Sequence, residues 1–169
     1  MSTKFFNNGL GNTLFDKLKG IASEMATFDR FLAVVGFFRS SGYFKLRKEL
    51  GDISEIKILV GINIDDIFRK HNKALLMLAD EDKAKEIYHN GFKEDIVNAQ
   101  YSPEVEEGIL QMCEDLVSGR LQMRIHATKN LHAKFYLCLP QNHSEHSDGW
   151  VIMGSSNISD SGLGIKQPP

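Results

Sequence analysis

The spacing of hydrophobic residues alternates along the chain between a helical and an extended pattern. Between Asn12 and Phe28 the apolar residues follow three- and four-residue spacings, which predicts an amphipathic helix capped by Asn12 or Thr13. The runs 30–38 and 55–62 are short, apolar and rich in residues that favour strands, so they predict buried strands. The segment 41–50 between these two runs predicts a second helix.

The middle of the chain is helical in composition. From Asp65 to about Glu94 positive and negative charges alternate, which is typical of solvent-exposed helix faces. The acidic pairs in this stretch are interpreted as helix-start residues rather than metal ligands, because carboxylates stabilise helix N-termini. Ser102 as N-cap and Pro103 at the first helical position then predict another helix, which ends near 118–119.

The last part of the chain changes character. Three extended runs follow one another, at 121–127, 131–139 and 150–154, separated by polar loops. Alternating elements early and clustered strands late predict the α/β class, with a mixed β-sheet. Because no repeat, linker or low-complexity stretch interrupts the pattern, we expect a single domain over residues 1–169.

Composition limits the range of functions. The chain has 169 residues, 42% of them hydrophobic, and a net charge of −2, which gives no bulk attraction to nucleic acid or acidic membranes. No run approaches the roughly 20 apolar residues of a membrane span, and the N-terminus lacks a signal-peptide core, so we expect a cytoplasmic protein. Cys113 and Cys138 match no metal-ligand spacing and are expected to be reduced thiols.

The run LHAKFYL, residues 131–137, contains the first candidate functional residues, a histidine and a lysine two positions apart. In a strand, successive side chains point to opposite faces, so His132 and Lys134 should share one face. The other face would be apolar, carrying Ala133, Phe135, Leu137 and Leu139. Because a buried lysine is costly without a partner, Lys134 should reach a sheet edge or a polar cleft, together with His132.

The next strand ends in Gly154, Ser155, Ser156 and Asn157, a pattern that predicts a tight turn and a short helix. Hydroxyl, amide and backbone N–H groups in such a turn can bind an anionic oxygen. If both segments lie in one sheet, they would surround a phosphate with an imidazole, an ammonium, a hydroxyl and an amide. The alternative is that both are ordinary structure, a strand-edge polar pair and a plain turn.

The two motifs together, H-x-K and then G-S-x-N, resemble those of the phospholipase D superfamily. The segment GSSNISDSGL is similar to its nuclease-type members. The whole chain resembles the phospholipase D-like domains at the N-terminus of bacterial DNA and RNA helicases. This resemblance implies an α-β-α sandwich, in which a mixed sheet is flanked by helices on both faces.

The resemblance also implies a two-step phosphodiester transfer without metal or cofactor. His132 would be the nucleophile that forms a covalent phosphohistidine, and a second histidine would protonate the leaving oxygen and then activate water. Lys134, Ser155 and Asn157 would hold the non-bridging oxygens. Gly154 and Ser156 would contribute to substrate binding, and His126 would sit near the site at the end of the preceding strand.

A single H-x-K supplies one histidine, so the resemblance implies a two-fold homodimer with the active site at the interface. The partner substrate would be nucleic acid, with DNA and RNA both open, and a membrane lipid is not expected. The remaining histidines are expected on helix faces or in a polar loop: His71, His89, His143 and His146.

The chain departs from the family pattern at two places. The aspartate of the family pattern falls at Leu139, and Asp148 is a candidate substitute for it. Because the aspartate is missing from its position, a second hypothesis is an accessory domain that binds nucleic acid without cleaving it. The family's acidic residue beyond G-S-x-N would fall after Pro169. We therefore expect the chain to be a piece of a longer protein with a helicase motor downstream.

Overall fold

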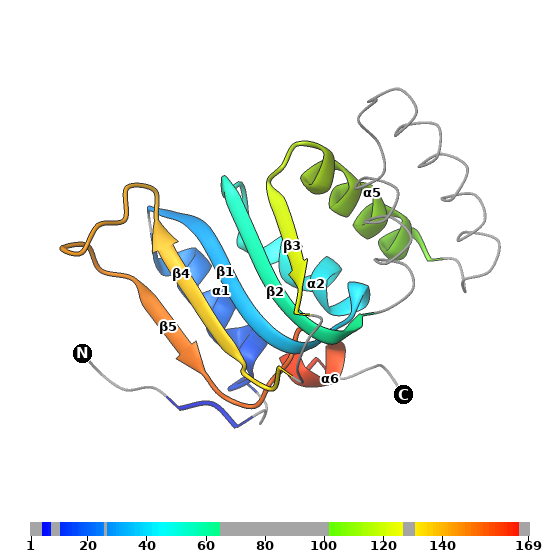
Figure 1. Cartoon of the computed structure of the whole chain (residues 1–169), viewed down its shortest axis with the longest axis horizontal. Helices are drawn as coiled ribbons and strands as arrows, with labels where there is room; N and C mark the ends of the chain where they lie inside the picture. Colours follow the sequence, from blue (N-terminus) through cyan, green and yellow to red (C-terminus); the bar gives the residue numbers. More distant parts are fainter. Residues whose placement is uncertain (1–4, 8–10, 26, 65–101, 127–130, 166–169) are drawn as a thin grey trace.

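Five strands form one mixed sheet in the computed structural model, which describes residues 5–7, 11–25, 27–64, 102–126 and 131–165 (Figure 1). The spatial order is β3-β2-β1-β4-β5. The first three strands in sequence pair in parallel, and the last two join antiparallel. The strands are β1 Phe28–Phe38, β2 Glu55–Ile64, β3 Leu121–Ile125, β4 Phe135–Pro140 and β5 Trp150–Met153.

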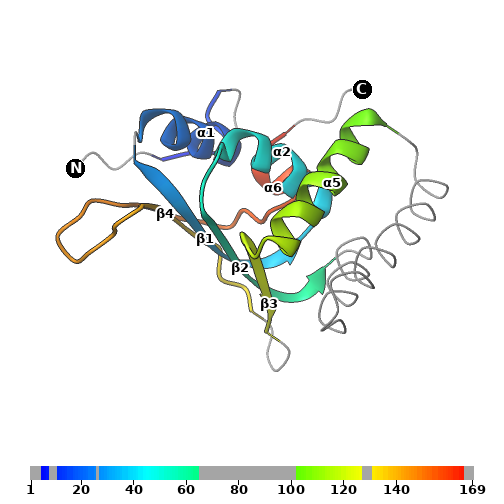
Figure 2. The same cartoon turned by 90° about the horizontal axis from the view of Figure 1, so that it is seen from above.

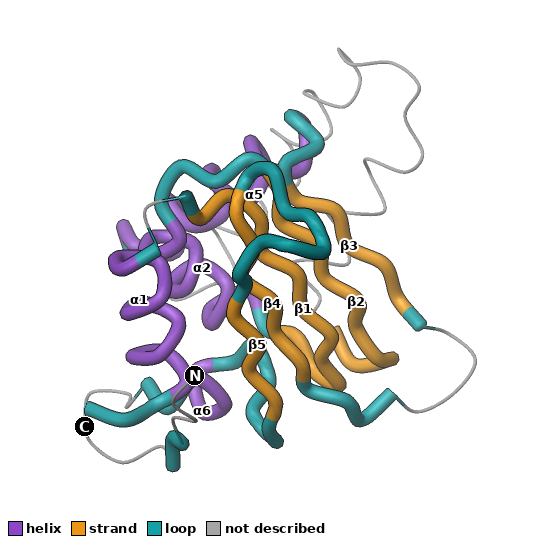
Figure 3. Tube along the Cα trace, turned by 90° about the vertical axis from the view of Figure 1, so that its left-hand side faces the viewer, coloured by secondary structure: helices purple, strands orange, loops and turns teal. Residues whose placement is uncertain are grey.

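The described helices pack on one face of this sheet (Figures 2 and 3). They are α1 Leu14–Glu24, α2 Ser40–Leu50, α5 Pro103–Val117 and α6 Asp160–Leu163. A mixed sheet with packed helices confirms the predicted α/β class. Helices on the opposite face stay a prediction, because the predicted helical segment 65–94, with His71 and His89, lies outside the described residues.

The helix starts follow the predicted capping residues. The Thr13 hydroxyl accepts a hydrogen bond from the Asp16 backbone N–H at 3.1 Å, and the Asp16 carboxylate accepts one from the Thr13 N–H at 2.9 Å. This reciprocal capping box satisfies two N–H groups that the first turn would otherwise leave unpaired. At α5 the Ser102 hydroxyl accepts from the Val105 N–H, and Pro103 occupies the first turn as predicted.

The hydrophobic core lies between the helices and one face of the sheet. Alternate side chains of β1 and β2 are almost completely buried there, and Leu14, Leu18 and Ile21 of α1 pack on them. The strand residues in this layer are Phe31, Ala33, Val35, Ile56, Ile58 and Val60. Burying so much apolar area supplies the main free energy that favours the fold.

The other face of the sheet, called here the open face, carries Leu32, Val34, Leu137, Val151 and Met153. The first three side chains are half-buried, whereas Val151 and Met153 are 55% and 72% exposed. Strand pairing aligns Leu32 with Leu137 and Leu137 with Val151, so these residues form a continuous apolar row. No described helix covers this face (Figure 2).

A buried charged cluster joins α2 to α5. The Asp115 carboxylate is completely buried, and the Arg47 guanidinium donates to both of its oxygens, at 2.7 and 3.2 Å. The Tyr43 hydroxyl, Arg120 and Gln111 also donate to it, at 2.9, 3.2 and 3.3 Å. Because every oxygen lone pair has a donor nearby, the carboxylate can be buried without an unpaired charge.

Candidate active site

The polar residues predicted to act on a phosphate gather partly at a bulge near the end of β1. The pairing of β1 with β2 shifts register between Val35 and Phe37. The side-chain oxygen of Asn157, far along the sequence, accepts hydrogen bonds from the backbone N–H groups of Gly36 and Phe37, both at 3.0 Å. The Asn157 side chain therefore lies against the bulge and fixes its backbone conformation.

Lys134 reaches the same place from the segment that precedes β4. A Cβ atom added at Gly36 would lie 3.3 Å from the Lys134 ammonium nitrogen and 3.5 Å from the Asn157 side-chain oxygen. The ammonium donates one hydrogen bond to the carbonyl of His132, at 2.5 Å. An ammonium has three donors, so Lys134 retains hydrogen-bonding capacity for a ligand.

His132 is exposed in the same short segment. Within the described part of the chain, no hydrogen bond or ion pair involves its imidazole, so both ring nitrogens are available to a ligand. His126 lies at the same end of the sheet, immediately after β3, where its backbone N–H donates to the Val60 carbonyl at 2.8 Å. The predicted position of His126 at a strand end is confirmed.

The predicted strand at 131–139 is only partly correct. β4 begins at Phe135, and residues 131–134 are irregular, so His132 and Lys134 precede the strand instead of sharing one of its faces. The side chains of β4 that enter the core are Tyr136 and Cys138, each 1% exposed. Phe135 and Leu137 were expected to anchor the strand, but they are half-buried on the open face.

Two glycines explain why residues 131–134 leave the strand. Cβ atoms added at Gly36 and Gly61 would lie 3.0 and 3.1 Å from the Leu131 carbonyl oxygen. The absence of side chains at these positions of β1 and β2 lets the backbone cross closely over the sheet. Glycine inside an apolar strand pattern is a signal for such an approach, and it could have identified this part of the site.

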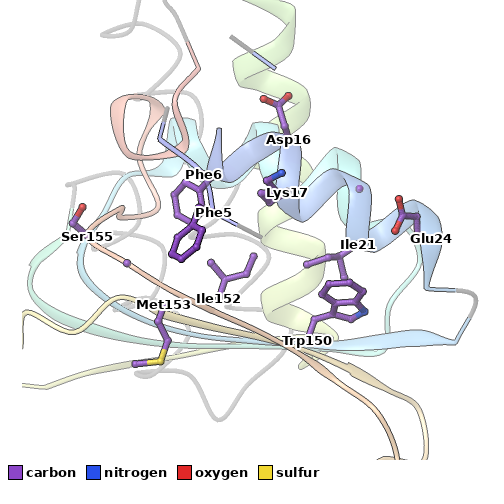
Figure 4. A pocket seen from close by; sticks show the side chains of 12 residues that line it. Phe5, Phe6, Asp16, Lys17, Ile21, Glu24, Trp150, Ile152, Met153 and Ser155 are labelled. Atoms are coloured by element: carbon purple, nitrogen blue, oxygen red, sulfur yellow. The ribbon is translucent and has the colours of Figure 1, made fainter. Parts of the chain in front are cut away.

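The turn after β5 divides its residues between two places. The Gly154 N–H donates to the Lys134 carbonyl at 3.2 Å, and Ser156 is buried, with its carbonyl accepting from the Tyr136 hydroxyl at 2.5 Å. Ser155 is exposed and lines a pocket beside α1 (Figure 4). No described contact joins Ser155 to His132 or Lys134, so its predicted role on the phosphate stays a prediction.

No described carboxylate forms an ion pair with Lys134. Leu139, at the position where the phospholipase D pattern has an aspartate, is 8% exposed and packs in the sheet. Asp148 lies in the loop between β4 and β5, at the opposite end of β5 from Ser155, so it does not take the place of the missing aspartate. His143 and His146 lie exposed in that loop, as predicted.

Two titratable side chains of β4 lie buried on the core side of the sheet. Burial raises the pKa of the Cys138 thiol to about 12, and burial also raises the pKa of the Tyr136 hydroxyl. Neither Cys113 nor Cys138 forms a disulfide among the described residues. A thiol that keeps its proton is a poor nucleophile, so the imidazole of His132 is the better candidate for nucleophilic chemistry here.

Comparison with protein-family models gave no match, and comparison with curated proteins gave none either. None of the described helices is long and apolar enough to cross a membrane.

Proposed function

We propose that this chain is a metal-independent phosphodiesterase of the nuclease type, which works through a phosphohistidine intermediate. One observation carries the proposal: Lys134 and Asn157, from two motifs far apart in sequence, meet over Gly36 beside the exposed His132. An ammonium and an amide at one point suit the non-bridging oxygens of a phosphodiester.

The chemistry assigns one role to each group. The neutral imidazole of His132 attacks phosphorus, and the P–O bond to the leaving alcohol breaks as a second histidine gives that oxygen a proton. The second histidine then takes a proton from water, which attacks phosphorus and breaks the P–N bond. Lys134 stabilises negative charge on the phosphoryl oxygens in both steps.

The second histidine would come from a second copy of the chain, because the sequence contains one H-x-K motif. The proposal therefore includes a two-fold homodimer in which two His132 residues face one phosphate. The substrate would be DNA or RNA, delivered in the cytoplasm by a helicase attached to this domain.

Hydrolysis of bis(p-nitrophenyl) phosphate in EDTA tests the proposal. We expect turnover that persists in the chelator and disappears on His132→Ala. His143→Ala is the matched control, because that histidine is exposed in the loop between β4 and β5, away from the site. Absence of turnover by the wild-type chain, or equal turnover by His132→Ala and His143→Ala, would exclude the proposed phosphodiesterase activity.

A second candidate function is nucleic-acid binding without cleavage. Two observations favour it: Leu139 puts a buried apolar group where the family has aspartate, and the Asn157 side-chain oxygen is already occupied by the β1 backbone. In that case labelled DNA or RNA would bind the wild-type chain and bind Lys134→Ala more weakly, with no product formed.

A further inference from the structure

The outer edge of β5 is open within the described residues. β5 pairs with β4 on one side, and no described strand pairs with its other side. The Gly154 N–H points toward β4, where it donates to Lys134. Backbone groups alternate in direction along a strand, so the N–H and C=O groups of Val151 and Met153 point away from β4.

The other edge strand, β3, carries protecting side chains, whereas the described residues provide no such protection for β5. Gln122 and Arg124 put exposed polar and charged side chains on β3, which discourages pairing with another chain. β5 consists of Trp150–Met153 and contains no charge and no proline. Val151 and Met153 are among its most exposed side chains. An edge of this kind is a template for an added strand.

A pocket of about 390 Å³ lies beside this edge on the helix side of the sheet. Its apolar walls come from three elements: the N-terminal segment, α1 and β5 (Figure 4). The wall residues are Phe5, Phe6, Ile21, Trp150 and Ile152. The volume is within the range of pockets that bind ligands in proteins, and several apolar side chains face it.

We propose that the β5 edge and this pocket bind an extended peptide segment, which adds a strand to the sheet. The outward groups of Val151 and Met153 would bond to the backbone of the peptide. Alternate peptide side chains would enter the pocket, and the others would lie next to Val151 and Met153 on the open face. The peptide should therefore be apolar on both faces at its centre. The proposal does not rest on the phosphodiesterase activity.

The charge around the pocket indicates a basic residue at one end of the peptide. Asp16, Lys17 and Glu24 of α1 lie at the rim (Figure 4). The Asp16 carboxylate already accepts hydrogen bonds from Thr13, and the charge of Lys17 offsets its charge, which leaves Glu24 as the unbalanced group. Glu24 is exposed in the last turn of α1, which has no basic residue, and the C-terminus of a helix adds further negative potential. A lysine or arginine of the peptide near Glu24 would compensate the Glu24 carboxylate and the negative potential at the C-terminus of α1.

A peptide fits this edge better than a second copy of the chain. If two β5 strands paired, the side chains on the helix side would be Trp150 and Ile152 of each copy. These side chains already form the wall of their own pocket, so both pockets would stay unfilled. A peptide brings side chains that can enter the pocket.

Fluorescence anisotropy with a labelled synthetic peptide tests the proposal. The probe is a peptide of about nine residues in which Leu and Val alternate between basic ends, a length that matches an ordinary strand. The same peptide with its central residue replaced by proline is the negative control, because proline cannot complete the ladder. We expect saturable binding of the first peptide and none of the second.

Two pairs of variants locate the binding. A Cβ atom at Gly20 of α1 meets nothing within 4 Å, so Gly20→Leu should fill the pocket without strain, whereas Gly20→Ala should leave it open. Val151→Pro removes one outward donor and leaves the bonds to β4, and Val151→Thr keeps that donor. We expect Gly20→Leu and Val151→Pro to weaken binding by about tenfold or more, with Gly20→Ala and Val151→Thr close to wild type.

Three results would overturn the proposal. One is no binding of the alternating peptide, and another is equal binding by all four variants. The third is a peptide-free dimer in sedimentation that Val151→Pro converts to a monomer, which would make a second copy the occupant. None of these results bears on hydrolysis by His132, so the two proposals fail separately.

Discussion

Two polar clusters in this molecule differ in how completely their groups are paired. In the α2–α5 cluster, Asp115 is fully buried and receives donors from Arg47, Tyr43 and two further side chains. At the β1 bulge, Lys134 donates to a carbonyl, and the exposed His132 imidazole has no partner among the described residues. A fully paired cluster stabilises the fold, whereas an incompletely paired one can still bind a ligand.

The largest expected effect comes from breaking the paired cluster. Asp115→Leu leaves the buried Arg47 without its carboxylate, so the free energy of unfolding should fall by about 3–5 kcal/mol. Urea denaturation followed by circular dichroism measures it. Glu114→Leu, at the exposed neighbouring position of α5, should change the value by less than about 0.5 kcal/mol. Equal losses in the two variants would show that the buried pairing is not important.

A smaller effect is expected at Asn157, which has a structural role within the candidate site. Asn157→Leu removes the acceptor for the N–H groups of Gly36 and Phe37, so we expect a loss of about 2 kcal/mol, whereas Asn157→Asp keeps an acceptor and most of the stability. Ser155→Ala is the control, because Ser155 is exposed and should cost under about 0.5 kcal/mol. If Asn157→Leu is as stable as the control, the amide does not hold the bulge.

Tyr43→Phe should have a still smaller effect, because Asp115 keeps its other donors. We expect a loss of about 1 kcal/mol at neutral pH from the missing hydrogen bond. Burial and the Asp115 charge raise the pKa of Tyr43, so the folded state keeps a proton that the unfolded state loses above about pH 10.

The pH dependence gives this prediction a second measurement. Stability from the raised pKa is fully present below about pH 10 and falls as the pH rises above it. Tyr43→Phe should therefore make the decline of the urea midpoint between about pH 9 and pH 11 less steep. Tyr136, whose pKa is also raised by burial, should preserve part of the decline. An unchanged slope would mean that Tyr43 ionises equally in both states.

The smallest effect on stability is expected at His132. Its side chain is exposed and has no described partner, so His132→Ala should change the free energy of unfolding by less than about 0.5 kcal/mol. The same urea titration measures it, with wild type as reference. A loss above about 1 kcal/mol would place the imidazole in a structural role instead.

Much of the fold could be predicted from local pattern. The helix starts at Thr13 and Ser102 were correct because their capping bonds join residues three apart in sequence. The buried cluster could not be predicted, because Asp115 and Arg47 are 68 residues apart and neither is unusual in sequence. The alternation of side chains along a strand shows only which residues share a face of the sheet. Which of the two faces the helices cover depends on long-range packing.

Only some residues of the candidate site, and not its geometry, could be predicted from the sequence. The two motifs identified Lys134 and Asn157, which the structure brings together at Gly36. Alternation placed His132 in a strand that begins only at Phe135. The reason is a contact between residues far apart in sequence. Gly36 on β1 and Gly61 on β2 have no side chains, so the backbone that precedes β4 can lie close to the sheet there.

The central claim is that His132 is the nucleophile, and trapping the intermediate tests it most directly. The chain is mixed with a phosphodiester labelled on its phosphoryl group, quenched in base during turnover, digested and analysed by mass spectrometry. We expect the peptide that contains His132 to carry the labelled phosphoryl group, still esterified to the second alcohol of the substrate. The adduct should be stable in base, lost in acid and absent from His132→Ala. Turnover without label on His132, or with label on another residue, would contradict the account.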